Sequence, residues 1–170
     1  MQAVKRNNLD FQKRLKLGHN FEDKVKKYLF GLGVIAYPFG LEYLSNSAKK
    51  ALIGLNDPTS LLIRFSPDLF CLVPGKFAFF VECKSSQSNT SNYSYNLESY
   101  QTSLKLSRMG IKILCVFSDL KAQWIENLPI RRQIMSVDKL KYVNGSQKPY
   151  ILIPKDKLLN LTKIIRDINN

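Results

Sequence analysis

The sequence predicts an α/β protein with a mixed central β-sheet and helices on both faces. Stretches with helical spacing alternate along the chain with short apolar runs that are typical of strands. The run of residues 77–81 is apolar at every position, as expected for a central strand covered on both sides. Pro74-Gly75 joins this run to the preceding one, which predicts a tight antiparallel hairpin.

The N-terminal part of the chain leaves two interpretations open. Residues 1–17 are polar and basic, and form either a helix or a loose arm that touches phosphates through Lys13, Arg14 and Lys16. A helix is predicted over residues 20–32, because apolar residues recur there at helical spacing. Asn20 is expected to cap this helix, which places Glu22 in its first turn.

The remaining elements follow from local pattern in chain order. Residues 34–39 are predicted to form a strand that ends at Pro38. Residues 41–55 can form a helix, and residues 56–58 are predicted to form a turn. Strands are predicted at residues 61–65, 68–73, 76–84, 111–117, 123–125 and 150–153. Residues 85–96 are expected to be a flexible polar loop, and helices are expected at residues 97–108 and 155–168.

A chain of 170 residues suits one domain with one core. We expect a single domain made of a basic arm (residues 1–17), a catalytic core (18–118) and an accessory or specificity region with a closing helix (119–170). The three cysteines lie in apolar runs without a CxxC pair, which predicts reduced thiols rather than disulfides or a zinc site.

The charge of the chain favours a polyanionic partner. Lys and Arg number 26 against 13 Asp and Glu, for a net charge of +13. Such an excess attracts nucleic acid or an anionic membrane. Because no apolar run is long enough to span a bilayer and no signal peptide is recognisable, we expect a cytoplasmic protein that binds nucleic acid and no membrane.

Two acids and a lysine are predicted to meet at one end of the hairpin. Asp68 opens one strand and Glu82 nears the end of its partner, so an antiparallel register brings them side by side. Lys84 leaves the same face as Glu82, whereas Cys83 points into the core. Two adjacent carboxylates repel each other, and a hard divalent cation such as Mg²⁺, or Mn²⁺ in its place, relieves that repulsion.

The same residues suit cleavage of a phosphodiester. A cation on Asp68, Glu82 and the backbone carbonyl of Cys83 would polarise the scissile phosphate and activate a water molecule. Lys84 would orient the water or neutralise the growing charge. Glu22 could hold a second metal or a metal-bound water. A plain alternative stays open, in which Glu22 favours the helix dipole and the strand-end charges are a solvated edge.

Ser66-Pro67-Asp68, a hairpin and Glu82-Cys83-Lys84 together resemble the PD-(D/E)XK nuclease superfamily. Residues 18–22 resemble its N-terminal helix motif, and Gln101 resembles the glutamine on the helix after the ExK strand. The resemblance covers residues 18–118 and implies a restriction-endonuclease-like core and divalent-metal hydrolysis of phosphodiesters. It assigns metal ligation to Asp68 and Glu82, catalysis to Lys84, and auxiliary roles to Glu22 and Gln101.

Within this superfamily, the small size and the early Glu resemble Holliday-junction resolvases, and the virus-type replication-repair nucleases share much of the pattern. The resemblance therefore implies a DNA endonuclease of recombination or repair, acting on branched DNA as a homodimer. Residues 119–150 match no motif. If they read base edges, a sequence-specific enzyme of the restriction or homing type is the alternative. A catalytically silent nucleic-acid-binding module and a basic packaging protein are the non-enzymatic alternatives.

Several further residues keep two interpretations. Asn92, Tyr93 and Tyr95 could enter a DNA groove, or belong to a plain connector. Arg131 and Arg132 could clasp phosphates or be surface charge. His19, the only histidine, could act as a base or ligand, but a polar residue beside a helix is the simpler interpretation. Trp124 is expected to pack rather than to stack on a base.

Overall fold

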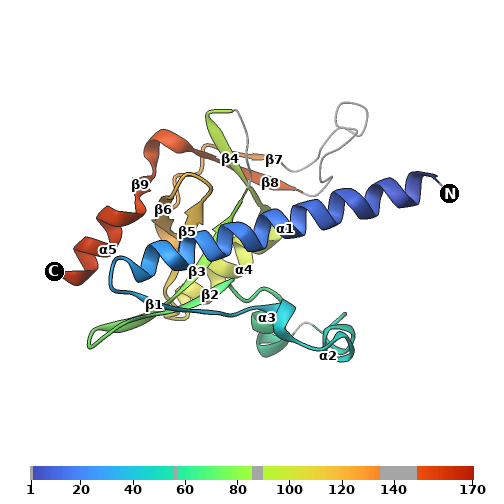
Figure 1. Ribbon diagram of the computed structural model, residues 1–170, viewed down its shortest axis with the longest axis horizontal. Coiled ribbons are helices and arrows are strands. Elements are labelled where there is room, and N and C mark those ends of the chain that lie inside the picture. The colour runs from blue at the N-terminus through green and yellow to red at the C-terminus, as the bar shows by residue number, and fades with distance from the viewer. Residues whose placement is uncertain (1, 56, 86–89, 135–148) are drawn as a thin grey trace.

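The computed structural model contains two β-sheets and five α-helices over the part of the chain that it describes (Figure 1). It describes residues 2–55, 57–85, 90–134 and 149–170, with the backbone alone for residues 2–15, 42 and 58. Within these residues, no helix combines the length and the apolar character that crossing a membrane requires. The mixed α/β architecture predicted from the sequence is confirmed.

The larger sheet has six strands in the order β1-β2-β3-β5-β6-β9. β3 and β5 are parallel, and the other neighbours are antiparallel. Its strands are β1 (Ile35–Pro38), β2 (Leu69–Val73), β3 (Phe77–Lys84), β5 (Ile113–Phe117), β6 (Lys121–Trp124) and β9 (Leu159–Asn160). The predicted hairpin is the β2–β3 pair, and Gly75 takes the positive φ of 72° that its tight turn requires.

The two faces of this sheet are covered by different elements. α1 (Gln2–Phe30) crosses one face, where Val25 and Leu29 join a core that also holds residues of α5 (Leu161–Asn169). The opposite face packs against α4 (Leu97–Arg108) and a smaller antiparallel sheet. That smaller sheet has the order β4-β8-β7 and consists of β4 (Asn92–Asn96), β8 (Tyr150–Pro154) and β7 (Arg132–Ile134).

The first helix is much longer than predicted. It begins at Gln2, so that residues 2–17 belong to the helix rather than to a loose arm, and Asn20 lies inside it rather than at its cap. The stretch before residue 20 lacks proline and is rich in Lys, Gln and Leu, which favour helix. Glu22 is therefore far from the first turn, and the helix dipole gives no reason for an acid at this position.

Residues 58–64 form a helix where a strand was predicted at 61–65. α3 (Pro58–Arg64) begins because Asp57 accepts a hydrogen bond from the backbone N–H of Ser60 at 3.0 Å and Pro58 occupies its first turn. The short apolar run fits either structure, and the cap decides it. The preceding segment, predicted to hold a helix, contains η1 (Leu41–Tyr43) and α2 (Asn46–Ala51).

The segment predicted as a flexible polar loop contains strand β4. Tyr93 and Tyr95 are buried and Ser94 between them is exposed, so the residues alternate as in a half-buried strand. Residues 86–89 lie outside the described part of the chain. The loop prediction was wrong for residues 92–96 because the many Ser and Asn side chains concealed the two-residue period of the tyrosines.

The closing helix begins later than predicted. Residues 155–168 form η3 (Lys155–Lys157), the short β9 and then α5, because Asn160 caps α5 by accepting a hydrogen bond from the backbone N–H of Thr162 at 2.9 Å. Before them, β6 ends at Trp124 and η2 (Ile125–Asn127) follows. Much of the predicted specificity region, residues 135–148, lies outside the described part of the chain.

Candidate active site

The β2–β3 register brings Asp68 next to the end of β3. Leu69 pairs with Val81, so the following pair along the two strands is Asp68 with Glu82. Oδ2 of Asp68 accepts a hydrogen bond of 2.6 Å from the backbone N–H of Cys83. Asp68 is thus held against β3 by its side chain as well as by the hairpin, and the two predicted acids meet at one sheet end.

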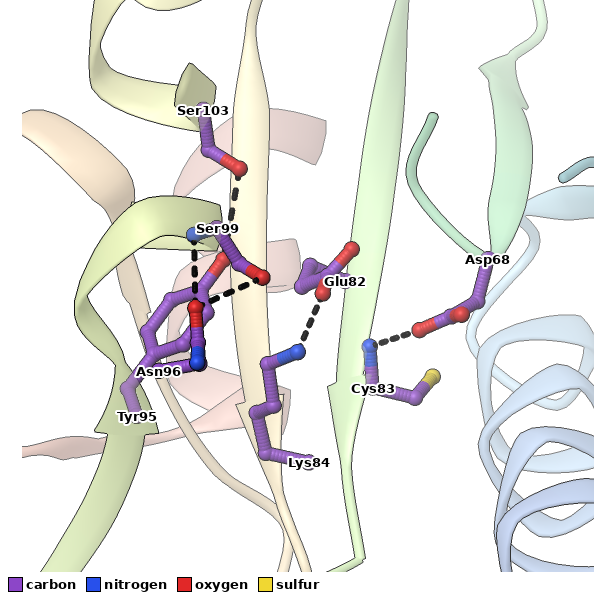
Figure 2. A network of polar contacts seen from close by, with 8 residues as sticks. All are labelled: Asp68, Glu82, Cys83, Lys84, Tyr95, Asn96, Ser99 and Ser103. Carbon is purple, nitrogen blue, oxygen red and sulfur yellow. Dashed lines mark hydrogen bonds and ion pairs between the residues drawn. The ribbon is translucent and has the colours of Figure 1, made fainter. Parts of the chain in front are cut away.

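Glu82 and Lys84 leave β3 on the same face, as predicted. Nζ of Lys84 makes an ion pair with Oε1 of Glu82, and Figure 2 shows the two side chains meeting beside β3. Glu82 is only 8% exposed. Cys83 takes the other face and packs against the core beneath α1, so that alternation along β3 separates the charged pair from the thiol.

Burial and mutual repulsion shape the charges of this group. Burial, followed by the negative charge of Glu82, raises the pKa of Asp68 well above its ordinary value, and Glu22 adds to this rise. Lys84 and the Cys83 N–H act in the opposite direction without cancelling it. For Lys84, burial opposes the charge, but the carboxylates of Glu82 and Asp68 outweigh burial and raise its pKa. Burial and the neighbouring carboxylates therefore disfavour the charged form of Asp68, while Lys84 keeps its charge beside Glu82.

Glu22 reaches the same neighbourhood from α1. It lines a small cavity of about 220 Å³ whose other walls include Leu69, the residue after Asp68, and Pro38 at the end of β1. Oε2 of Glu22 lies 3.4 Å from Nδ1 of His19, one turn earlier. Glu22 thus lines the same small cavity as the residue that follows Asp68, and its role beside the acidic pair stays a prediction.

The donor set suits a hard divalent cation. Asp68 and Glu82 offer carboxylate oxygens, and the raised pKa of Asp68 is the mark of a buried acid without enough positive charge around it. Burial raises the pKa of the Cys83 thiol well above its ordinary value, which leaves the backbone carbonyl as the group that Cys83 can contribute. Among the described residues, no three His, Cys, Asp or Glu side chains cluster as a metal site, so phosphate and water would complete the coordination.

Gln101 is not brought to the site. It is exposed on α4, whereas Ser103 of the same helix is buried. Because a helix turns by about 100° per residue, Gln101 lies on nearly the opposite side of α4 from both Ser99 and Ser103. The inward side of this helix therefore presents serines, and a role of Gln101 in the site stays a prediction.

The predicted DNA-contacting residues fall into two groups. Lys16, Arg131 and Arg132 are exposed, so their contact with phosphates stays a prediction, while the side chains of Lys13 and Arg14 lie outside the described residues. Tyr93 is 0% exposed and stacks on Phe117 with ring centroids 4.5 Å apart. The structure does not offer Tyr93 to DNA, and Asn92 beside it is only partly exposed.

Three further aromatic or polar residues have clear places. Trp124 packs edge-on against Phe79 at 5.8 Å, in agreement with its expected packing role. Tyr95, expected from the sequence to contact DNA or to belong to a connector, places its ring against Nζ of Lys84, and its hydroxyl is hydrogen-bonded to Ser103 of α4 (Figure 2). The alternation Tyr93-Ser94-Tyr95 directly before the helix is the pattern that could have revealed a buried strand here.

Comparisons with known proteins are sparse. No protein-family model matches this sequence, and no curated protein matches it. Among solved structures, the fold is similar to that of Hjc, a Holliday junction resolvase from the archaeal hyperthermophile Archaeoglobus fulgidus, with a TM-score of 0.49 and 11% sequence identity. The similarity covers 87% of this chain and 99% of that chain. The function proposed below rests on the site and on the order of its elements.

Proposed function

We propose that this protein is a metal-dependent nuclease of the PD-(D/E)XK type that hydrolyses phosphodiester bonds in DNA. The observation that carries the proposal is the meeting of Asp68, Glu82 and Lys84 at the end of the β2–β3 hairpin, with Lys84 paired to Glu82. The arrangement of α1, the β1–β3 strands, α4 and the parallel strand β5 supports it, since the restriction-endonuclease-like core expected from the sequence has this type of mixed sheet.

The residues divide the chemical work between them. A divalent cation bound by Asp68, Glu82 and the Cys83 carbonyl would act as a Lewis acid on a phosphate oxygen. Lys84 places a positive charge beside these acids, where it can offset the negative charge that grows on phosphorus as water attacks. The bond from phosphorus to the leaving sugar oxygen then breaks. Glu22 would act from α1 as an auxiliary acid that orients water or a second ion.

DNA is the proposed substrate because the chain carries a net charge of +13. Branched DNA, as in recombination and repair, is the finer part of the proposal and follows from the resemblance to Holliday-junction resolvases. A homodimer belongs to it as well, because a two-fold junction needs two symmetric cuts. Equal cutting of linear duplex at defined sequences would favour a restriction or homing enzyme instead.

The test is cleavage of end-labelled four-way junction, flap and linear duplex DNA with Mg²⁺, with Mn²⁺ and with EDTA. We expect cleavage with either metal, none with EDTA, and loss of cleavage in Asp68→Ala and Glu82→Ala while DNA binding persists. Asp167→Ala is the matched control, because it removes an exposed carboxylate of α5. It should cleave as the wild type does.

The same experiment separates the alternatives. Tight, salt-sensitive binding without cleavage in any metal would contradict the proposal and indicate a silent DNA-binding module. Binding that neither metal nor the two alanine substitutions affect would indicate a basic packaging protein. Normal turnover by Asp68→Ala or Glu82→Ala would remove the assigned roles even if the wild type proved to be a nuclease.

A further inference from the structure

Lys84 has a second neighbour besides Glu82. Its Nζ lies 4.4 Å from the centroid of the Tyr95 ring. This is well within the distance at which an ammonium group is attracted by an aromatic face. The ammonium thus contacts a carboxylate and a ring, and the two contacts come from different sheets, since Glu82 is in β3 and Tyr95 is in β4.

The Tyr95 ring is fixed in place. The residue is 1% exposed, and its hydroxyl is hydrogen-bonded to the hydroxyl of Ser103 on α4, with 3.2 Å between the oxygens. Ser103 is itself only 2% exposed. Tyr100 meets the Tyr95 ring edge-on, with centroids 6.0 Å apart. A ring held at its hydroxyl and at its edge cannot turn away from Lys84 without breaking buried contacts.

The chain around Tyr95 is also well determined. β4 pairs with β8, and Tyr95 stands opposite Ile151 in that pair. The next residue, Asn96, caps α4 by accepting a hydrogen bond of 3.0 Å from the backbone N–H of Ser99. Because strand and helix join at this cap, the ring of Tyr95 and the hydroxyl of Ser103 are set by one rigid unit, as Figure 2 shows.

A lysine side chain without such support has four flexible bonds, and its ammonium samples many positions. Loss of a partly desolvated cation–π contact is enough to lower, by about tenfold, the fraction of time that the ammonium spends at its position over the ring. A misplaced charge near the phosphate lowers the rate of the chemical step, whereas DNA binding depends mainly on other basic residues.

We propose that Tyr95, anchored by Ser103, is a positioning residue that holds the Lys84 ammonium in place for phosphodiester cleavage. This inference rests on the proposed nuclease function and adds to the site a support that belongs to the second sheet. It assigns Tyr95 no contact with DNA or metal. The effect of Tyr95 on the reaction passes through Lys84.

The kinetic test uses Tyr95→Leu, which removes the ring face, and Tyr95→Phe, which keeps it. We expect Tyr95→Leu to lower kcat by about tenfold with unchanged affinity for DNA, and Tyr95→Phe to retain most of the wild-type kcat. Tyr150→Leu is the matched control, because Tyr150 belongs to β8 of the same sheet. Its kcat per folded molecule should equal that of the wild type.

A double-mutant cycle shows whether Tyr95 acts through Lys84. In a Lys84→Ala background, adding Tyr95→Leu should cost no further activity. A further loss as large as in the wild-type background would overturn the proposal, because Tyr95 would then act by another route. Wild-type kcat in folded Tyr95→Leu would overturn it as well.

A spectroscopic test needs neither cleavage nor a stable Leu variant. The ring face should shift the NMR signals of the Lys84 side-chain methylene protons upfield in the wild type and in Tyr95→Phe. Lys84→Arg identifies these signals by removing them. Absence of an upfield-shifted lysine in the wild type would overturn the inference, whatever its activity. If the shift is present but the wild type cleaves no DNA, the proposed function fails and the contact alone remains.

Discussion

The hairpin of residues 69–84 and the segment of residues 92–108 serve the site in opposite ways. The hairpin and the residue before it carry the charged groups. Because charged side chains are costly to bury, they stand out in the sequence when they occur within apolar strand-forming runs. The later segment contributes a buried tyrosine, a buried serine and a helix cap, and its polar composition resembles that of a loop. The contrast teaches that reacting groups can be recognised locally, whereas the groups that support them cannot.

The largest effect beyond the metal ligands should come from Lys84. We expect Lys84→Ala to reduce kcat by roughly a hundredfold to a thousandfold, as for removal of one preorganised donor from a transition state. DNA affinity should change little. Lys105→Ala, which removes an exposed lysine of α4, is the control and should leave kcat unchanged. A loss of affinity with normal kcat would make Lys84 only a binding residue.

A smaller effect is expected from Glu22, which approaches from α1 and not from the hairpin. Glu22→Gln should lower kcat by about tenfold, at the lower end for a group that supports metal ligands. The comparison variant is Asp23→Asn, which removes the adjacent carboxylate of the same helix and breaks its ion pair with Lys26, 3.3 Å away. Equal effects of both variants would mean that Glu22 acts only through the net charge.

The cost of holding Asp68 in the site should appear in stability measurements. Because its pKa is raised in the folded protein, folding retains a proton that the unfolded chain loses above pH 3.8. Stability therefore falls as the pH rises from there through the folded pKa, and stays reduced above it. Asp68→Asn has no such charge, so it should be more stable than the wild type at pH 8.

Thermal unfolding between pH 4 and pH 8 without metal measures this difference. The advantage of Asp68→Asn should vanish towards pH 4, and added Mg²⁺ should stabilise the wild type more at pH 8 than at pH 5. Asp167→Asn is the control, since it changes the same charge on an exposed surface. A wild type that is more stable than Asp68→Asn at pH 8 would contradict the raised pKa of Asp68 in the folded protein.

The smallest effect is expected at Gln101. Because it is exposed on the outer side of α4, Gln101→Ala should change kcat by less than about twofold, as is usual for a surface substitution. Ser103→Ala, on the inner side of the same helix, should have the larger effect of the two. The reverse order would restore the role that the family resemblance gives to Gln101 and weaken the support assigned to Ser103.

Several parts of the fold could be predicted from residues alone. The hairpin, the alternation that separates Cys83 from Glu82 and Lys84, and helix α4 with its bounds follow from local periodicity and turn residues. The beginnings of α1 and α3 could not be predicted, because a short apolar run or a polar stretch fits more than one structure. For α3, the cap at Asp57 decided the outcome.

For the candidate site, the sequence by itself determined which charges stand at the strand ends and on which face each lies. Successive side chains of a strand point to opposite faces of the sheet, and this alternation depends only on local sequence position. Only the tertiary structure decided that Glu22 approaches from within a long helix and that Tyr95, bonded to Ser103, contacts Lys84. These contacts join distant segments across two sheets, and no local pattern records which distant surface a side chain will meet.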